Sequence, residues 1–395
     1  MPSRRTLLAT APALLAMPAL AQRRPAAQAE APPAASPART PLGPLDVFAR
    51  EALIIDFDTG AELLEKDADA PMPPSSMSKL MTVYVIFSLL HQGRLTLDQK
   101  LPVSERAWRM GGSKMFVQVG DTIAVSDLLR GIIVQSGNDA CLVFEEAIGG
   151  SESGFAEILN ETAQKIGLRH STFRNSTGWP HPEHQMTCRD LAILARRLIT
   201  DFPEFYKIYS EKSFRYANIT QQNRNPLVQR DLADGLKTGH TEAAGYGLVA
   251  SSLRNGRRVI MVCNGWSSMR QRAEEGTRLM EWAFREFENV TLFTAGDVVE
   301  EAPVWLGERS TVPLVGGHAL VMTMPRAWRR TATVKVEYQS PVPAPVRRGD
   351  QIGHLALSGE GVPPMRVPLF AGADVDRMGL PGRALAVMTR MIGGG

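Results

Sequence analysis

Cysteine is scarce in this sequence, and long hydrophobic runs are confined to its first residues. Cys141, Cys188 and Cys263 are its three cysteines, and they lie far apart with no CxxC pair. This spacing excludes a disulfide-rich scaffold and provides no cysteine-based metal motif. Two of the three stand in apolar segments, which favours small buried side chains, while a single disulfide stays open. After the N-terminus, no segment has the length and apolarity that a membrane-spanning helix needs.

An excess of charge of one sign is also missing. The 395 residues carry 44 Lys and Arg against 41 Asp and Glu, a formal net charge of +3. No basic run is interleaved with aromatic residues, so we expect no nucleic-acid partner. The chain is 44% hydrophobic, which suits the cores of two or three globular domains. His170, His181, His184 and His354 lack acidic partners at metal-ligand spacing, so surface loops are expected there, with no metal and no cofactor.

The N-terminus has the pattern of an export signal. Arg4 and Arg5 precede the apolar stretch LLATAPALLAMPALA, and a small-x-small site predicts cleavage after Ala21. The SRRTLL segment is equally compatible with a twin-arginine signal, which exports folded proteins. Residues 22–45 are rich in Pro and Ala and predict a flexible linker. With residues 1–21 removed as a signal peptide, the protein is expected in the periplasm.

Two hairpin signals lie on either side of a helical middle. Apolar runs flank Asp58-Thr59-Gly60 near the start and Asn255-Gly256 near residue 255. Most segments between them have helical spacing or helix-forming composition. Strands early and late with helices between predict an antiparallel sheet beside an all-helical lobe, an α+β domain over residues 46–288.

The pattern of apolar and polar residues changes after this domain. Short alternating runs broken by Gly and Pro predict a small all-β domain over residues 289–377. The tail, residues 378–395, places five apolar residues on one helical face: Leu380, Ala384, Val387, Met388 and Met391. This pattern is typical of a short amphipathic helix at a membrane surface, which would associate the protein peripherally with the inner membrane. An ordinary terminal helix, packed or frayed, is the alternative.

The helix in PPSSMSKLMTVYVIFSLL begins with a serine and a lysine one turn apart. It is apolar almost all round from Ser76 to about His91, so we expect it to be buried. Ser76 and Lys79, at i and i+3, share a helix face. Burial makes the neutral amine of a lysine more accessible, and a neutral amine can take the proton of a hydroxyl. Alternatively, Ser75 or Ser76 caps the helix and Lys79 extends to solvent.

Two further polar segments follow along the chain. Ser136 and Asn138 lie in the segment IIVQSGNDACL, in a predicted turn between apolar helices. The serine could relay a proton and the asparagine could bind a substrate carbonyl; alternatively, the turn only interrupts the helix, with Asn138 or Asp139 as the cap of the next one. DGLKTGHTEAAGYGLV places Lys237, Thr238 and Gly239 just before the second hairpin. A lysine and a hydroxyl there can bind a carboxylate, and Gly239 lets a substrate backbone approach the strand. Taken alone, the first segment is better explained as a helix break and the second as a solvated strand end.

The three segments together resemble a known family. SMSK, SGN and KTGHT follow one another at about 60 and then 100 residues, as in the penicillin-recognising serine hydrolases. They are most similar to the low-molecular-mass penicillin-binding proteins, the D-alanyl-D-alanine carboxypeptidases, over about residues 46–378. Ser78 departs from the threonine usual in that family. The resemblance implies a transpeptidase-like domain, with a five-stranded antiparallel sheet and a helical lobe, followed by a small all-β domain.

The resemblance also implies roles. Ser76 is the nucleophile that becomes acylated, Lys79 its general base and Ser136 the proton relay to the leaving D-alanine. The backbone N–H groups of Ser76 and His240 form the oxyanion hole.

The remaining motif residues bind substrate. Asn138 holds the substrate amide, Lys237 and Thr238 recognise the terminal carboxylate, and Gly239 lies between them and His240. The implied partners are peptidoglycan stem peptides and β-lactam antibiotics.

Other activities share these motifs. A β-lactamase has all three, and Glu157–Asn160 mimics its Glu-x-x-Asn loop, although that segment is predicted to be helical. The chain also continues for about 155 residues beyond Lys237, more than a lactamase needs. A DD-endopeptidase acting on cross-links would use the same site. A peptidoglycan-binding scaffold without catalysis would not form a covalent penicillin adduct on Ser76.

Overall fold

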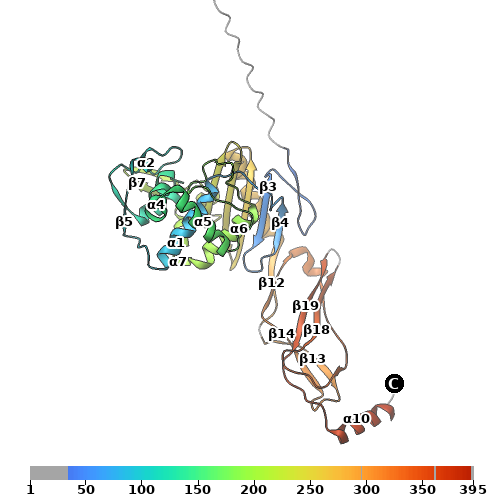
Figure 1. The fold of residues 1–395 in the computed structure, drawn as a ribbon. Helices are drawn as coiled ribbons and strands as arrows, with labels where there is room; N and C mark the ends of the chain where they lie inside the picture. The colour runs from blue at the N-terminus through green and yellow to red at the C-terminus, as the bar shows by residue number, and fades with distance from the viewer. Residues whose placement is uncertain (1–33, 295, 360–361, 393–395) are drawn as a thin grey trace, which may run out of the picture. The chain divides into compact units, whose positions relative to one another are not determined.

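The computed structural model describes residues 34–294, 296–359 and 362–392 (Figure 1). The predicted signal peptide and the first part of the predicted linker lie outside these residues.

The second part of the predicted linker is instead folded. Strand β1 (Ser36–Ala38) pairs antiparallel with β2 (Leu45–Val47). Arg39 exchanges two backbone hydrogen bonds with Glu65, of 2.8 and 2.9 Å, and the side chain of Ala38 is buried. The Pro- and Ala-rich composition suggested a flexible chain, but pairing with a strand distant in sequence overrides it.

A five-stranded antiparallel sheet forms the centre of the first domain, as predicted, in the order β4-β3-β11-β10-β9. Its strands are β3 (Glu51–Asp56), β4 (Glu62–Lys66), β9 (Gly235–Thr241), β10 (Gly245–Arg254) and β11 (Arg257–Trp266). The two predicted hairpins meet where Ile55 pairs with Ile260. Asn255 and Gly256 both have positive φ, +50° and +80°, as a two-residue hairpin turn requires.

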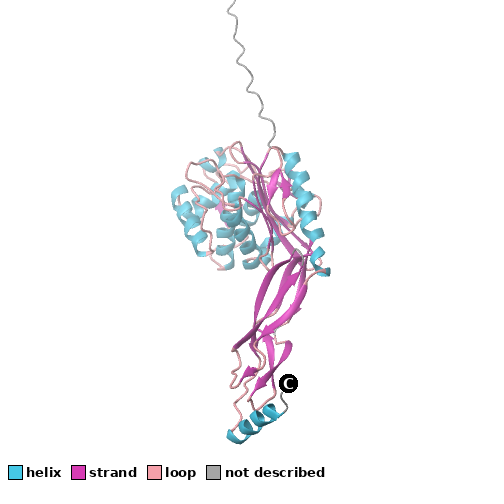
Figure 2. Ribbon diagram, turned by 90° about the vertical axis from the view of Figure 1, so that its right-hand side faces the viewer, coloured by secondary structure: helices cyan, strands magenta, loops and turns pink. Residues whose placement is uncertain are grey.

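The two faces of this sheet bury different partners (Figure 2). Val249 and Ile260 face the helical lobe, whereas Leu248 and Met261 face helix α9 (Met269–Glu286) on the other side. This alternation follows from the two-residue period of a strand.

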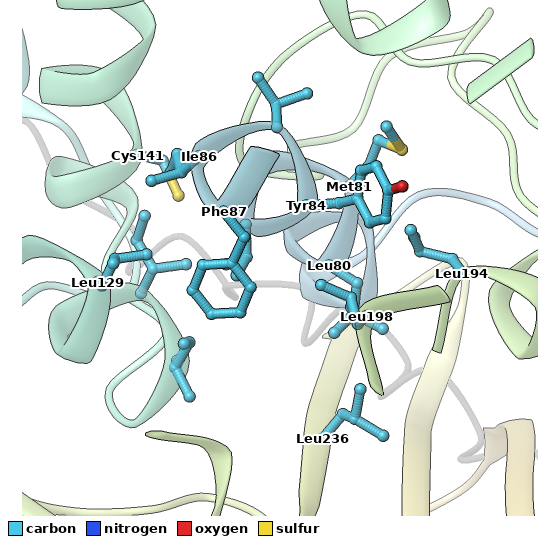
Figure 3. Packing of buried hydrophobic residues seen from close by; sticks show 14 of the residues in the cluster. Leu80, Met81, Tyr84, Ile86, Phe87, Leu129, Cys141, Leu194, Leu198 and Leu236 are labelled. Atoms are coloured by element: carbon cyan, nitrogen blue, oxygen red, sulfur yellow. The ribbon is translucent and has the colours of Figure 1, made fainter. Parts of the chain in front are cut away.

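The helical lobe surrounds α1 (Lys79–His91), which directly follows the 3₁₀ turn η1 (Ser76–Ser78). Ten of its thirteen residues are buried, as the apolar sequence predicted, and Figure 3 shows Leu80, Tyr84 and Phe87 among the side chains of this core. The other helices are α2 (Glu105–Arg109), α3 (Val125–Ile133), α4 (Asn138–Gly149), α5 (Glu152–Lys165), α6 (Cys188–Asp201), α7 (Pro203–Tyr206), η2 (Lys207–Ser210) and α8 (Pro226–Gln229). Two small two-stranded sheets pair β5 (Lys100–Pro102) with β6 (Thr122–Ala124), and β7 (Ser213–Tyr216) with β8 (Ile219–Gln222).

The second domain is built of strands and begins where α9 ends, at Phe287. Strand β12 (Phe287–Phe293) pairs with β15 (Leu320–Pro325), and a six-stranded sheet has the order β16-β18-β19-β14-β13-β17. Its strands are β13 (Val298–Trp305), β14 (Thr311–Gly316), β16 (Thr333–Tyr338), β17 (Val342–Pro343), β18 (Gln351–Gly359) and β19 (Val362–Ala371). The 3₁₀ turn η3 (Arg326–Arg330) follows β15. This domain has its own core, which includes Val312, Leu355 and Leu369.

Helix α10 (Leu380–Ile392) lies within the predicted tail. Leu380 and Met391 on its apolar face are 75% and 79% exposed. Among the described residues, no helix combines the length and apolarity required to cross a bilayer. All three cysteines are free and buried, as expected for small apolar side chains.

Candidate active site

Ser76 and Lys79 contact each other at the start of the central helix. Ser75 caps the η1 turn, where its Oγ accepts the Met77 N–H at 3.5 Å, so the Ser76 hydroxyl is not used for capping. Lys79 is fully buried and does not extend to solvent. Its Nζ donates to Ser76 Oγ at 2.9 Å and to the Thr177 carbonyl at 2.6 Å. These contacts hold the amine against the hydroxyl.

The surroundings of Lys79 favour its neutral form. Burial, together with the positive charge of Arg224, lowers the pKa of Lys79 to about 8, although Cys141 and Asp139 act in the opposite direction. A pKa near 8 leaves roughly a tenth of the molecules with a neutral amine at pH 7, against fewer than about one in a thousand for an ordinary lysine. The amine can therefore act as a base near neutral pH.

Reaction of Ser76 should consequently depend on pH. Protonated Lys79 cannot accept the hydroxyl proton, so the rate of acylation by a labelled penicillin is expected to fall about tenfold per pH unit below the Lys79 pKa and to level off above it. Stopped-flow measurement between pH 5.5 and 9.5 checks this. A rate independent of pH across 6 to 8 would contradict a basic role for Lys79.

Two glycines allow neighbouring segments to pack closely against the η1 turn, the catalytic turn that carries Ser76. A Cβ on Gly178, whose φ is +75°, would lie 2.0 Å from the Ser75 carbonyl oxygen. A Cβ on Gly239 would lie 2.1 Å from Ser75 Oγ. We expected Gly239 to admit a substrate backbone, and the structure shows a further reason for glycine, the close approach of β9 to η1.

The SGN segment lies in a strained turn before α4. Ser136 has a φ of +62°, in the left-handed region. Its buried Oγ lacks a hydrogen-bond partner in the described part of the chain, and it lines the same cleft as Ser76. Asn138 begins α4 and donates its side-chain N–H to the Gly111 carbonyl at 2.9 Å. A conformation that costs free energy, next to an unpaired hydroxyl, is typical of a functional position.

Asp139 anchors the loop that contributes Ser113 to the cleft. Its buried carboxylate accepts the backbone N–H groups of Met115, Phe116 and Val117 at 2.9 to 3.2 Å. Asn138 N–H donates to the Ser113 carbonyl at 2.7 Å, and Ser113 lines the cleft. The turn and this loop therefore form one unit.

The KTG segment is on β9, an edge strand of the five-stranded sheet. Lys237 is only 3% exposed, and burial followed by the nearby charges of Lys79 and Arg224 holds its pKa well below the ordinary value. Thr238 and His240 line the cleft, and the His240 ring stacks on Tyr246 at a centroid distance of 3.9 Å. An edge strand can pair its free backbone groups with an extended peptide.

The cleft has two halves that meet at Ser76. One half, of about 420 Å³, is lined by Ser136, Thr238 and two arginines, Arg224 and Arg272. The other, of about 460 Å³, shares Ser76, Ser113 and His240 with the first half and is otherwise lined by residues that include Asn138, Thr177, Trp179 and Glu242. The structure therefore brings the three motifs together around one cleft, with a cationic half on one side of the serine.

Comparison with known proteins identifies the family of both domains. Residues 35–267 match the family model described as D-alanyl-D-alanine carboxypeptidase, and residues 287–377 match the C-terminal domain of penicillin-binding protein 5. This chain belongs to the D-alanyl-D-alanine carboxypeptidase family. The predicted family and fold class are both confirmed.

Several relatives in this carboxypeptidase family match most of the chain. The D-alanyl-D-alanine carboxypeptidase DacC of Escherichia coli is 36% identical over 346 residues, covering 85% of this chain and 86% of its own. DacD from Francisella tularensis has a similar structure, with a TM-score of 0.76 and 30% identity, covering 85% and 95%. Penicillin-binding protein 5 from Haemophilus influenzae has a TM-score of 0.72 and 34% identity, covering 83% and 98%.

His184 departs from its expected position. We predicted a surface loop, but the side chain is 2% exposed and its Nε2 lies 2.9 Å from the Oγ of Ser78, where the carboxypeptidase family usually has threonine. His184 Nδ1 accepts the Arg174 N–H at 3.4 Å, so Nε2 carries the proton and donates to Ser78. Burial, helped by the charge of His181, lowers its pKa to about 4. The neutral ring ties this loop to the catalytic turn.

Other residues that line the cleft were not predicted from sequence. Arg272 is 7% exposed, its pKa is lowered to about 10 by burial, and its Nε has no hydrogen-bond partner within the described chain. Arg224 donates to Ser113 Oγ at 2.6 Å. Neither arginine is in a motif, and Thr177 contributes only a backbone carbonyl. In the described ranges, no group of three or more His, Cys, Asp or Glu side chains has the geometry of a metal site.

Proposed function

We propose that this enzyme removes the terminal D-alanine from peptidoglycan pentapeptide stems through an acyl-enzyme on Ser76, and that β-lactams acylate the same serine. The contact of 2.9 Å between a fully buried Lys79 amine and the Ser76 hydroxyl carries the proposal, because it makes an activated nucleophile without histidine. Membership of the carboxypeptidase family supports the same reaction.

The chemistry proceeds in two stages. Neutral Lys79 takes the Ser76 proton while Oγ attacks the carbonyl carbon between the two D-alanines. The N–H groups of Ser76 and His240 stabilise the oxyanion, each worth about 3 kcal/mol in such sites. The C–N bond then breaks as the proton held by Lys79 passes through the unpaired hydroxyl of Ser136 to the leaving amine, which returns Lys79 to its neutral form. Water next attacks the ester, with Lys79 again as base, and releases the shortened peptide.

The cationic half of the cleft suits the leaving D-alanine. Its carboxylate would accept hydrogen bonds from Thr238 and benefit from the charges of Arg224 and Arg272, with Lys237 buried beside them. The unpaired Nε of Arg272 is a donor already removed from water. The acyl side of the substrate then lies in the other half, with its amide at Asn138.

The covalent adduct provides the direct test. Incubation with a labelled penicillin is expected to add the mass of one penicillin molecule to a peptide that contains Ser76. The variant Ser76→Ala is expected to gain no such mass. Purified muropeptides should release free D-alanine. Separated cross-linked dimers would indicate the endopeptidase, turnover of the penicillin at tens per second would indicate a β-lactamase, and absence of any adduct would indicate a binding scaffold.

We further propose that α10 attaches the protein to the surface of the inner membrane. Leu380, Met388 and Met391 are 75%, 56% and 79% exposed on a short helix, which supports insertion of one face at the lipid boundary. The full chain should sediment with phosphatidylethanolamine/phosphatidylglycerol vesicles, and a variant with Leu380→Glu and Met388→Glu should stay in the supernatant. Leu253→Glu, at a 54% exposed position in β10, is the control. Equal sedimentation of the natural chain, the double variant and the Leu253→Glu control would contradict the proposal.

Export to the periplasm is likewise proposed from the N-terminal sequence. The charged start, apolar stretch and small residues before Gln22 support it. Fractionation of cells that express the full chain should recover it in the periplasm. Replacement of Arg4 and Arg5 by lysine should block export only if the signal is of the twin-arginine type.

A further inference from the structure

An apolar groove borders the acyl half of the catalytic cleft. Its volume is about 500 Å³, and its lining includes Pro74, Pro182 and Ala243. Pro180 and Thr241 line both this groove and the cleft that contains Ser76. The two hollows are therefore neighbours that share these two residues.

The position of the positive charges in the cleft decides which end of a substrate reaches the groove. Under the proposed function, on which this inference rests, the terminal carboxylate lies beside Arg224 and Arg272. The chain before the scissile bond must then run the other way, past Asn138 and Trp179. A stem peptide that continues in this direction arrives at Pro180 and Thr241.

The groove is held in shape before any ligand binds. Five prolines with fixed φ line it: Pro71, Pro73, Pro74, Pro180 and Pro182. Thr241 Oγ1 donates to the Pro74 carbonyl at 3.2 Å, and Met72 exchanges backbone hydrogen bonds of 2.7 and 3.2 Å with Met186. A preformed surface loses little conformational entropy when a ligand binds.

The lining also includes a hydrogen-bond donor suited to a carboxylate, the imidazole of His181. His181 Nδ1 accepts the Glu183 N–H at 3.1 Å, so in the neutral ring Nε2 carries the proton. His181 is exposed at the groove. A γ-linked D-glutamyl residue keeps a free α-carboxylate, and the alanine before it presents a methyl group. This combination of an acid and small apolar groups matches an imidazole among prolines.

We propose that the groove is a subsite for the L-alanyl-γ-D-glutamyl end of the stem peptide, so that the enzyme distinguishes long stems from short D-alanyl-D-alanine peptides. The test compares two substrates, diacetyl-L-Lys-D-Ala-D-Ala and L-Ala-γ-D-Glu-L-Lys-D-Ala-D-Ala, by release of D-alanine. In the natural enzyme, kcat/KM for the long peptide is expected to exceed that for the short one by about tenfold, the worth of a modest added contact.

Two variants examine the groove separately. Ala243→Trp, in the exposed turn after β9, should fill it and bring the long-to-short ratio of kcat/KM close to one. His181→Ala should lower the ratio about threefold by removing the donor to the carboxylate. Leu253→Trp, at an exposed position outside the groove, should keep the natural ratio. Melting temperatures establish that each variant is folded.

The outcomes separate this inference from the proposed function. Hydrolysis of the short peptide with a ratio near one, or a ratio unchanged in both Ala243→Trp and His181→Ala, would overturn the subsite and leave the carboxypeptidase intact. If neither peptide releases D-alanine, the proposed function fails. The subsite is then judged by protection of Ser76 from labelled penicillin, which must need less of the long peptide than of the short one.

Discussion

Replacing Lys79 by methionine is expected to slow acylation of Ser76 by a labelled penicillin by about 10³-fold, the loss typical when a general base is removed. Methionine has a similar length and no charge, so it fills the buried site while it removes the proton acceptor 2.9 Å from Ser76 Oγ. The residual rate should also lose its dependence on pH, because the group that titrates near 8 is gone.

A matched control separates chemistry from folding. Lys165→Met, whose side chain is 75% exposed on α5, should acylate at the natural rate. Circular dichroism and melting temperature should show that Lys79→Met folds. If its acylation rate stays within tenfold of the natural one, another group must take the Ser76 proton, and the mechanism proposed above is wrong.

Gly239→Ala is expected to reduce acylation by about 10²-fold and to destabilise the protein. The new Cβ would lie 2.1 Å from Ser75 Oγ and 2.9 Å from Ser75 Cβ, so either β9 or the η1 turn must move. Overpacking of this kind costs about 1–3 kcal/mol. Displacing the nucleophile from the His240 N–H by about 1 Å is enough for a hundredfold loss in rate.

Urea unfolding and stopped-flow acylation measure the two effects. Gly379→Ala is the control, because a Cβ there meets no atom closer than 3.9 Å. An alanine at 239 that acylates normally would show that β9 and the catalytic turn can separate without consequence, contrary to the tight packing described here.

Local patterns in the sequence predicted most of the architecture. The Asn255-Gly256 turn and the apolar helix after Ser76 each depend on neighbours within a few residues, and both lie where the sequence placed them. The order of the three motifs then identified the family, which supplied the topology that joins β3 to β11. The positions of the eight predicted site residues follow from that topology, while their catalytic roles stay predictions.

Contacts distant in sequence account for what the sequence did not reveal. Thr177 meets Lys79 across 98 residues through a backbone carbonyl, which has no residue-type signature. His184 is buried by a contact with Ser78 across 106 residues, although its loop is rich in Pro and His. Arg272 lies on a helix whose polar composition indicates solvent exposure, yet it lines the cleft. Composition alone could not distinguish these residues from surface ones.

The adjacent serines at the start of the central helix divide two duties between them. The Ser75 hydroxyl accepts the Met77 N–H of the turn, so the reactive Ser76 hydroxyl is not needed for capping. Ser76→Ala should therefore yield an intact but inert receptor, able to hold an uncleaved stem peptide long enough for crystallography. Ser75→Ala would have the opposite character, a weakened scaffold in which the attacking group is drawn toward the vacant amide.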